Sequence, residues 1–190
     1  LYMVSKKNDS TTIILQEQNS FPGITTRLFA KKANKICIAF EEPNHAFGDN
    51  TVVTGNPVRK GIGDGDKRNG FHEFRFKEEY KTIFLFGGSQ GSAYLNRMIS
   101  KVAEKISHSG IQLLWQTGDL EFQKYNHFES KNIRIVPFVN NMADAYAISD
   151  LIVCRSGALT LAEITVCGKP SILIPASKVI SVKVLLSFFL

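Results

Sequence analysis

The stretch from residue 150 to residue 175, DLIVCRSGALTLAEITVCGKPSILIP, constrains the fold of this chain more than any other. Residues 151–154 are a continuous apolar run, which is typical of a strand covered on both faces of a parallel sheet. Residues 155–157 interrupt the run, and the short helical pattern that follows is expected to end with Gly168 as its C′ residue. A second strand is expected at residues 171–174. Two strands joined by one helix predict a βαβ unit of a parallel sheet.

The turn between the first strand and the helix is a candidate ligand site. Ser156 is expected to be the N-cap of the helix, and Gly157 lets the backbone turn sharply. The amides of residues 158–160 would then point outward and offer an edge that binds an anion or a hydroxyl group.

Glu163 is the one carboxylate of this helix. It shares a helical stripe with Leu159 and Val166, so it lies beside apolar positions and needs a partner. The pattern alone fits a solvated side chain and a carboxylate that binds the diol of a ribose equally well. The Ser-Gly turn favours the diol, because ligands of α/β sheets collect at the carboxyl ends of strands.

Strand and helix patterns alternate from Lys81 onward. Strands are expected at residues 82–86, 111–116 and 133–139. One helix before Gly110 is expected to bury Leu95, Ile99, Val102 and Ile106, and further helices are expected at residues 120–128 and 141–149. The alternation predicts an α/β fold with a right-handed, doubly wound parallel sheet and helices on both faces.

The glycine-rich turn GGSQGS at residues 87–92 connects the first of these strands to its helix. Its glycines allow close backbone approach, the helix N-terminus offers amides, and Ser89 adds a hydroxyl, all of which suit a phosphate or diphosphate. The turn has neither the GxGxxG spacing nor the Lys-Ser/Thr ending of a P-loop, and a tight turn that binds nothing stays the alternative.

The N-terminal third has the same alternation on a smaller scale. A strand at residues 11–15 runs into the polar cluster QEQN, and a helix at residues 24–33 is expected to bury Ile24, Leu28 and Phe29. Two further strands are expected at residues 36–40 and 51–54.

A domain boundary is expected at Pro57-Val58-Arg59, because the glycine-rich, charged segment GIGDGDKRNG follows it. Asp64 and Asp66 stand in that segment. They are interpreted as parts of a solvated loop and not as metal ligands. The four histidines are scattered and are expected at the surface.

The composition limits the class of partner. A net charge of +6 and a pI near 9.2 favour anionic partners, which include nucleic acid, diphosphates and acidic membrane surfaces. The basic pairs are spread along the chain and form no nucleic-acid stripe. Three cysteines without a CxxC motif predict reduced, buried thiols and a cytoplasmic protein. The N-terminal residues LYMVSKKNDS lack the hydrophobic region of a signal peptide, so none is expected. The apolar tail at residues 179–190 is expected to be a buried strand or a non-native end and not a membrane anchor.

Several segments together carry a family resemblance. They are QEQNSFPGITTRLFAKKAN, TGNPVR, FGGSQGSAYLN, PFVNNMADAYAISDLIVCRSGALTLAEI and GKPSILIP. In this order and spacing they resemble the MurG family of peptidoglycan glycosyltransferases. The resemblance implies a GT-B fold, with residues 1–56 as the end of the N-terminal, acceptor-side domain and residues 57–190 as the C-terminal, UDP-GlcNAc-binding domain.

The resemblance also implies an activity. The family transfers GlcNAc from UDP-GlcNAc to undecaprenyl-pyrophosphoryl-MurNAc-pentapeptide, lipid I, and forms lipid II with inversion at the sugar. It works at the cytoplasmic face of the bacterial inner membrane as a peripheral protein, without a cofactor or a metal held by an aspartate pair. UDP-GlcNAc, lipid I and the membrane surface are the implied partners, and nucleic acid is not among them.

Site residues follow from the same resemblance. Asn19 would lie near the transferred sugar, with Gln16 in place of the histidine of the common HEQN motif. Arg59 would contact the nucleotide, and Ser89 its diphosphate. Val139 would bind the uracil through backbone groups.

The helix after the RSG turn would supply the rest of the donor site. Glu163 would accept hydrogen bonds from the ribose hydroxyls. The phosphate and ribose edge would be lined by Ala158, Leu159, Thr160, Leu161 and Ala162.

The chain departs from the family at both ends. The glycine-rich loop with a candidate catalytic histidine has no counterpart before Leu1, so the catalytic base is unassigned, and ASKVISVKVLLSFFL replaces the family's polar segment. A frameshifted gene, a truncated gene or a partial sequence would explain both. The isolated chain is therefore expected to bind a uridine nucleotide weakly at best. A non-catalytic UDP-binding fragment and another GT-B enzyme, such as a UDP-GlcNAc 2-epimerase, are the alternatives, and a dinucleotide oxidoreductase is weaker because GxGxxG is missing.

Overall fold

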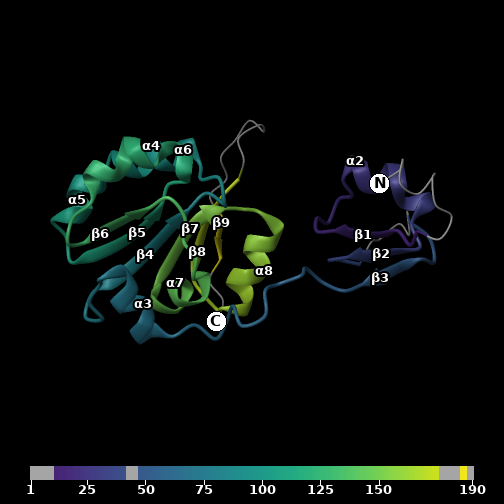
Figure 1. The fold of residues 1–190 in the computed structure, drawn as a ribbon, viewed down its shortest axis with the longest axis horizontal. Helices are drawn as coiled ribbons and strands as arrows, with labels where there is room; N and C mark the ends of the chain where they lie inside the picture. Colours follow the sequence, from purple (N-terminus) through teal and green to yellow (C-terminus); the bar gives the residue numbers. More distant parts are fainter. Residues whose placement is uncertain (1–10, 42–46, 176–184, 188–190) are drawn as a thin grey trace. The chain divides into compact units, whose positions relative to one another are not determined.

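A computed structural model describes residues 11–41, 47–175 and 185–187 (Figure 1). The chain divides into two compact units, Leu1–Val58 and Arg59–Leu190. The division falls at the segment where the composition becomes glycine-rich and charged. Assignment of the two units to acceptor and donor domains stays a prediction.

The first unit contains a three-stranded parallel sheet in the order β1-β2-β3. Its strands and helices are β1 (Ile14–Glu17), α2 (Ile24–Phe29), the 3-10 helix η1 (Ala30–Lys32), β2 (Lys35–Ile38) and β3 (Thr51–Val53). Apolar residues that alternate along β1 and β2 form its core with two alanines of the helical segment and its end: Ile13, Leu15, Ala30, Ala33, Ile36 and Ile38.

Of the three residues expected to face inward from the helix at residues 24–33, Phe29 packs against this core, but the prediction is wrong for Ile24 and Leu28. Ile24 and Leu28 are 69% and 70% exposed, while Thr26 is buried. The Thr26 hydroxyl donates to Glu17 Oε2 at 2.7 Å, and this buried bond sets the rotation of α2 about its axis. A hydroxyl therefore takes the inward position that the apolar pattern gave to its neighbours.

The second unit is a six-stranded sheet in the order β6-β5-β4-β7-β8-β9. The strands are β4 (Lys81–Phe86), β5 (Ile111–Gln116), β6 (Ile133–Val136), β7 (Leu151–Arg155), β8 (Ser171–Ile174) and β9 (Leu185–Ser187). All neighbours pair in parallel except β8 and β9, which are antiparallel. The predicted parallel sheet is confirmed, and part of the apolar tail is a strand; its residues 179–184 and 188–190 lie outside the described ranges.

Helices cover both faces of this sheet (Figure 1). One face carries α4 (Ala93–Ser100), α5 (Ala103–Ser107) and α6 (Asp119–Tyr125), which continues into the 3-10 helix η2 (Asn126–Phe128). The other face carries α3 (Lys67–Phe74), α7 (Met142–Ile148) and α8 (Ala158–Val166). The core on the first face surrounds Trp115, which is fully buried, with Leu85, Leu95, Ala103, Leu113, Tyr125, Ile133 and Ile135.

Helix α3 was not expected. Asp66, which the sequence placed in a solvated loop, is its N-cap and accepts a hydrogen bond from the Asn69 amide at 3.0 Å. Position 70 of this helix requires a glycine, because a Cβ there would lie 2.8 Å from the Asp144 carbonyl oxygen of α7. Close packing of two helices, and not a flexible loop, explains this glycine.

Other boundaries also differ from expectation. The strands expected at residues 11–15 and 36–40 are Ile14–Glu17 and Lys35–Ile38. The single helix expected before Gly110 is two helices that break at Val102, which is 39% exposed. The strand expected at residues 133–139 ends at Val136, because Pro137 has no amide hydrogen to donate. Gly157 and not Ser156 is the N-cap of α8, and no side chain caps that helix.

A carboxylate joins the amino ends of β4 and β7. Asp150 accepts from Lys81 Nζ and from the Thr82 amide, both at 2.8 Å. Burial raises the pKa of this carboxyl, but the bonds from Lys81 and Thr82 outweigh burial and hold the pKa below its usual range.

Candidate functional site

The strand order reverses between β4 and β7, so the carboxyl ends of these two strands are the expected ligand-binding edge of the sheet. From β4 the chain adds β5 and β6 on one side, and then returns to add β7 and β8 on the other. In open α/β sheets ligands bind where this direction reverses. The turns that leave β4 and β7 are residues 87–92 and 155–157, which are the two turns singled out from the sequence.

The turn after β4 holds Ser89 at the surface. Ser92 caps α4, because its hydroxyl oxygen accepts from the Leu95 amide at 3.4 Å. Gly91 has a φ of 75°, and a Cβ on it would lie 1.9 Å from the Thr117 carbonyl oxygen. This glycine therefore allows close approach to the loop after β5, whereas the sequence interpretation gave such glycines to a ligand.

Gln116 connects two of the predicted ligand segments and was missed from the sequence. Its side chain is buried; Nε2 donates to the Gly88 carbonyl and Oε1 accepts from the Val139 amide, each at 2.9 Å. One amide group thus fixes the turn beside Ser89 and the backbone of Val139 relative to each other. A glutamine at the end of an otherwise apolar strand was the available signal.

Asn96 of α4 anchors the loop that follows β5. It is 1% exposed; its Nδ2 donates to the Thr117 carbonyl at 2.9 Å and to Glu121 Oε2 at 2.7 Å. Its Oδ1 accepts from Trp115 Nε1 at 2.9 Å. These bonds hold the end of β5, where Gln116 lies, in a fixed position.

Helix α8 supplies the third segment of the site. Its first turn is half-buried at Ala158, Leu159, Thr160, Leu161 and Ala162. Gly168, with φ 59°, ends the helix as predicted: its amide donates to the Thr165 carbonyl at 3.1 Å and the Lys169 amide to the Ile164 carbonyl at 3.3 Å. Because α8 follows β7, which is parallel to β4, the α8 N-terminus lies at the same edge of the sheet as the turn after β4.

Glu163 already has two partners within the protein. Arg59 Nε donates to its Oε1 at 3.0 Å, and the Tyr146 hydroxyl donates to its Oε2 at 3.1 Å. The Glu163 side chain is 7% exposed and that of Arg59 is 54% exposed. Two residues expected at the nucleotide are thus bonded to each other, and Tyr146 is a neighbour that the sequence analysis did not name.

The acidic side chains around this carboxylate have raised pKa values. Burial, and after it the negative charge of Glu163, raises the pKa of the Tyr146 hydroxyl far above its usual range. Burial raises the pKa of the Cys154 thiol to about 12 and, with Glu163, raises that of Cys167. All three groups are neutral at pH 7, so Tyr146 is a hydrogen-bond donor and not a base.

Asn19 belongs to the first unit and is exposed at the end of β1. Its backbone amide and its Nδ2 donate to Glu17 Oε1 at 3.0 and 3.1 Å, and the Gly23 amide donates to Glu17 Oε2 at 2.7 Å. Burial raises the pKa of Glu17, but the bonds from Gly23, Asn19 and Thr26 outweigh it and lower the pKa. Glu17 thus fixes the loop that carries Asn19.

The described ranges contain no group of three or more His, Cys, Asp or Glu side chains that could hold a metal ion. The three histidines among them, His72, His108 and His127, are exposed, as expected. No helix in the described part of the chain is long and apolar enough to cross a bilayer.

Comparison with known proteins places this arrangement in a family. The model of the glycosyltransferase family 28 C-terminal domain matches residues 82–182, which is more than half of the chain. The chain belongs to glycosyltransferase family 28. The predicted Rossmann-like fold of GT-B type is confirmed by this family 28 domain and by the parallel sheet.

Two family 28 relatives carry the name UDP-N-acetylglucosamine--N-acetylmuramyl-(pentapeptide) pyrophosphoryl-undecaprenol N-acetylglucosamine transferase. The protein of Flavobacterium psychrophilum is 40% identical over 170 residues, which cover 87% of this chain and 46% of the relative. The protein of Cytophaga hutchinsonii is 41% identical over 169 residues, again 87% and 46%. The chain therefore spans about half the length of these relatives.

Solved structures share the fold. The crystal structure of Acinetobacter baumannii MurG matches with a TM-score of 0.59 and 24% identity over 94% of this chain and 49% of that one. Os79 of O. sativa, crystallised with UDP, matches with a TM-score of 0.55 and 14% identity over 78% and 37%. At these identities the likeness concerns the fold alone.

Proposed function

We propose that residues 59–175 bind the donor UDP-GlcNAc in a hexosyltransferase that transfers GlcNAc to lipid I and forms lipid II. The observation that carries the proposal is the name shared by the relatives at about 40% identity over 87% of the chain. The site supports it chemically. An exposed serine hydroxyl and the first turns of α4 and α8 lie at one edge of the sheet, where amides and helix dipoles favour a diphosphate.

The nucleotide and the protein compete for Glu163 in this proposal. The ribose hydroxyls are proposed to donate to the Glu163 carboxylate. In the structure this carboxylate accepts hydrogen bonds from Arg59 and Tyr146. Tyr146 is buried and stays in place, whereas the half-exposed Arg59 is free to leave. When UDP-GlcNAc binds, the Arg59 guanidinium therefore leaves Glu163 and contacts the nucleotide. The ribose hydroxyls then donate to the Glu163 oxygen that Arg59 has left.

The remaining residues have the following roles in the proposal. Ser89 and the α8 first turn stabilise the diphosphate, whose negative charge grows as the sugar leaves. The Val139 backbone binds the uracil at a distance that Gln116 fixes. Asn19 acts from the first unit near the transferred sugar, and the base that deprotonates the acceptor hydroxyl is not assigned to any residue of this chain.

The acceptor implies where the protein works. Lipid I is a membrane lipid, so the enzyme is proposed to act as a peripheral protein at the cytoplasmic face of the inner membrane, in cell-wall synthesis. The reaction itself is proposed to invert the sugar and to use no metal ion.

Calorimetric titration of the 190-residue chain with UDP, UDP-GlcNAc and NADH tests the donor site. We expect saturable binding of both uridine nucleotides and none of NADH. Glu163→Ala should weaken UDP binding by about 1.5 to 3 kcal/mol, the range for a hydrogen bond to a charged group, and Glu104→Ala on the exposed side of α5 should not. Arg59→Gln decides the exchange: weaker binding supports a contact with the nucleotide, and tighter binding means that Arg59 only blocks Glu163.

Fluorescence of the buried Trp115 shows whether each variant is folded. A folded chain that binds no uridine nucleotide would reject the proposal for residues 59–175. Conversion of UDP-GlcNAc to its UDP-linked 2-epimer, without an acceptor and without release of UDP, would favour the epimerase alternative.

A further inference from the structure

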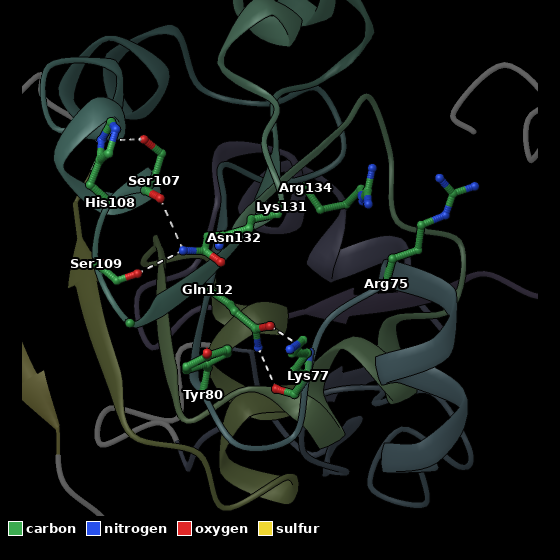
Figure 2. Close-up of a pocket in the computed structure, with 11 residues that line it drawn as sticks. Arg75, Lys77, Tyr80, Ser107, His108, Ser109, Gln112, Lys131, Asn132 and Arg134 are labelled. Carbon is green, nitrogen blue, oxygen red and sulfur yellow. Dashed lines mark hydrogen bonds between the residues drawn. The ribbon is translucent and has the colours of Figure 1, made fainter.

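A cavity lies at the edge of the sheet formed by the amino ends of β5 and β6 (Figure 2). Because the strands are parallel, this edge is opposite the carboxyl ends that form the candidate donor site. The cavity has a volume of about 610 Å³, within the range of small-molecule sites. Its lining comes from the ends of α3 and α5 and from the starts of β5 and β6: Arg75, Lys77, Tyr80, Ser107, His108, Ser109, Gly110, Gln112, Lys131, Asn132 and Arg134.

The cavity wall is strongly cationic. Four of the lining residues, Arg75, Lys77, Lys131 and Arg134, carry a positive charge, and none of the lining residues is acidic. In the described part of the chain, Glu129 pairs with Arg134, and Glu79 pairs with Lys77 at 3.4 Å. The ion pairs there include neither Arg75 nor Lys131, so the cavity keeps an excess of two positive charges.

Buried amide side chains hold the wall in place. Gln112 Oε1 accepts from the Lys77 amide at 2.7 Å, and its Nε2 donates to the Lys77 carbonyl at 2.9 Å. Asn132 Nδ2 donates to the Ser109 carbonyl at 2.8 Å, and Arg134 Nε donates to the Phe74 carbonyl at 3.1 Å. The cations therefore stand on a fixed frame, which lowers the entropy cost of binding an anion.

Arg75 reaches the cavity through an unusual backbone conformation. It is the C-cap of α3 with φ 54°, and among the described non-glycine residues it is the one with a positive φ. The left-handed cap turns the chain from α3 toward Lys77 and places the guanidinium at the rim (Figure 2). Glycine would be the ordinary residue at such a cap, and an arginine there adds a charge to the cavity.

We propose that this cavity binds a phosphate ester of a small organic molecule. A phosphate monoester carries a charge near −2 at pH 7, which matches the two unpaired cations, whereas a single carboxylate would leave one of them unmatched. A guanidinium group binds two phosphate oxygens at once, and Arg75 supplies the one guanidinium of the wall that no ion pair of the described part of the chain engages. The half-exposed Tyr80 ring forms a flat wall beside Gly110 for the organic part. The ester is either a free metabolite or the headgroup of a phosphatidic acid lipid, since both present a phosphate monoester.

Titration with glycerol 3-phosphate, followed by the backbone amide shifts of the isotope-labelled 190-residue chain, tests the proposal. Saturable shifts at Gly110 and Lys131, with none at Gly88 and Ser89, place the ligand in the cavity and not in the donor site. The variant Arg75→Asn/Lys131→Gln should weaken binding at least tenfold; asparagine tolerates the left-handed cap. The matched control, Arg97→Gln/Lys101→Gln on α4, loses the same charge and should bind as the unmodified chain does.

Co-sedimentation with phosphatidylcholine vesicles that contain phosphatidic acid separates the two sources. Saturable binding of glycerol 3-phosphate without vesicle binding assigns a free ester. Vesicle binding that is lost in Arg75→Asn/Lys131→Gln and kept in the control assigns a headgroup. The proposal is overturned if neither probe binds, or if the two double variants lose binding equally, which would indicate a general effect of net charge.

Discussion

The hydrogen bond from Tyr146 to Glu163 allows a quantitative test of how the candidate site is held together. The Tyr146 hydroxyl lies 3.1 Å from Glu163 Oε2, and both residues are at least 95% buried. Tyr146→Phe removes this donor and leaves the ring in place, with its edge-on contacts to Phe84 and Phe86 at 6.0 and 6.2 Å. The substitution therefore creates no cavity, and its effect reports the hydrogen bond.

The expected loss of unfolding free energy is about 1.5 to 3 kcal/mol, the range for a hydrogen bond to a charged group. A value near the top of that range is expected, because the carboxylate is buried and Arg59 alone would remain to satisfy it. The pair with Arg59 contributes less, since its exposed guanidinium is screened by water.

Urea denaturation followed by tryptophan fluorescence measures this loss. Trp115 is the one tryptophan of the chain and is fully buried in the second unit, so the signal reports that unit. A loss of about 2 kcal/mol shifts the midpoint by about 1 M if m is about 2 kcal/mol per M. Tyr125→Phe is the matched control: its ring is buried, but its hydroxyl interacts with the exposed Lys124, so little change is expected.

A double-mutant cycle completes the test. Tyr146→Phe and Glu163→Gln should be non-additive, because each removes the charged hydrogen bond that the other also removes. If Tyr146→Phe costs no more than Tyr125→Phe, or if the two substitutions add independently, the bond does not stabilise the site and the reasoning fails.

Three further predictions concern the second unit. Gln116→Leu should weaken UDP binding at least tenfold in calorimetry. Gln112→Leu, which breaks three side-chain hydrogen bonds near the opposite end of β5, should leave UDP affinity unchanged; equal affinities for both variants would reject a positioning role. Because Asp150 has a lowered pKa in the folded state, its stabilising contribution is complete above its unfolded pKa of about 3.9 and is lost as the pH falls through the folded value. Asp150→Asn should therefore lower the urea midpoint at pH 7 and flatten its fall below about pH 4, and a parallel fall in both proteins would contradict this. Gly91→Ala should destabilise far more than Gly88→Ala in thermal unfolding, because a Cβ meets backbone at 1.9 Å at the first glycine and open space at the second, although φ is positive at both; equal losses would mean that backbone strain alone decides.

Periodicity and apolar runs were sufficient for the elements of the parallel sheet. The strands at residues 111–116 and 171–174 have the bounds expected from the sequence, because each is a short, mostly apolar run that begins directly after Gly110 or Pro170. Gly168 was also predictable, because a glycine after a short helix satisfies the terminal carbonyls in one common way. The two glycine-containing turns were recognised as ligand candidates for the same local reasons.

Features that depend on the packing of distant residues were not predictable. Helix α3 contains Gly70 because α7 lies against it, and that neighbour is more than 70 residues away along the chain. The rotation of α2 follows from one buried hydroxyl bond to Glu17, which no apolar pattern contains.

The sequence by itself determined the strands β4 to β8, the turns that carry Ser89 and the α8 N-terminus, and the family, because these depend on local patterns of residues. Only the tertiary structure decided that Glu163 is bonded to Arg59 and Tyr146, that Gln116 joins two loops, and that four cations share a cavity at the far edge of the sheet. The physical reason is the same for all three. A hydrogen bond or an ion pair depends on distances of about 3 Å between groups, and the folded chain brings together residues that the sequence separates by up to 104 positions.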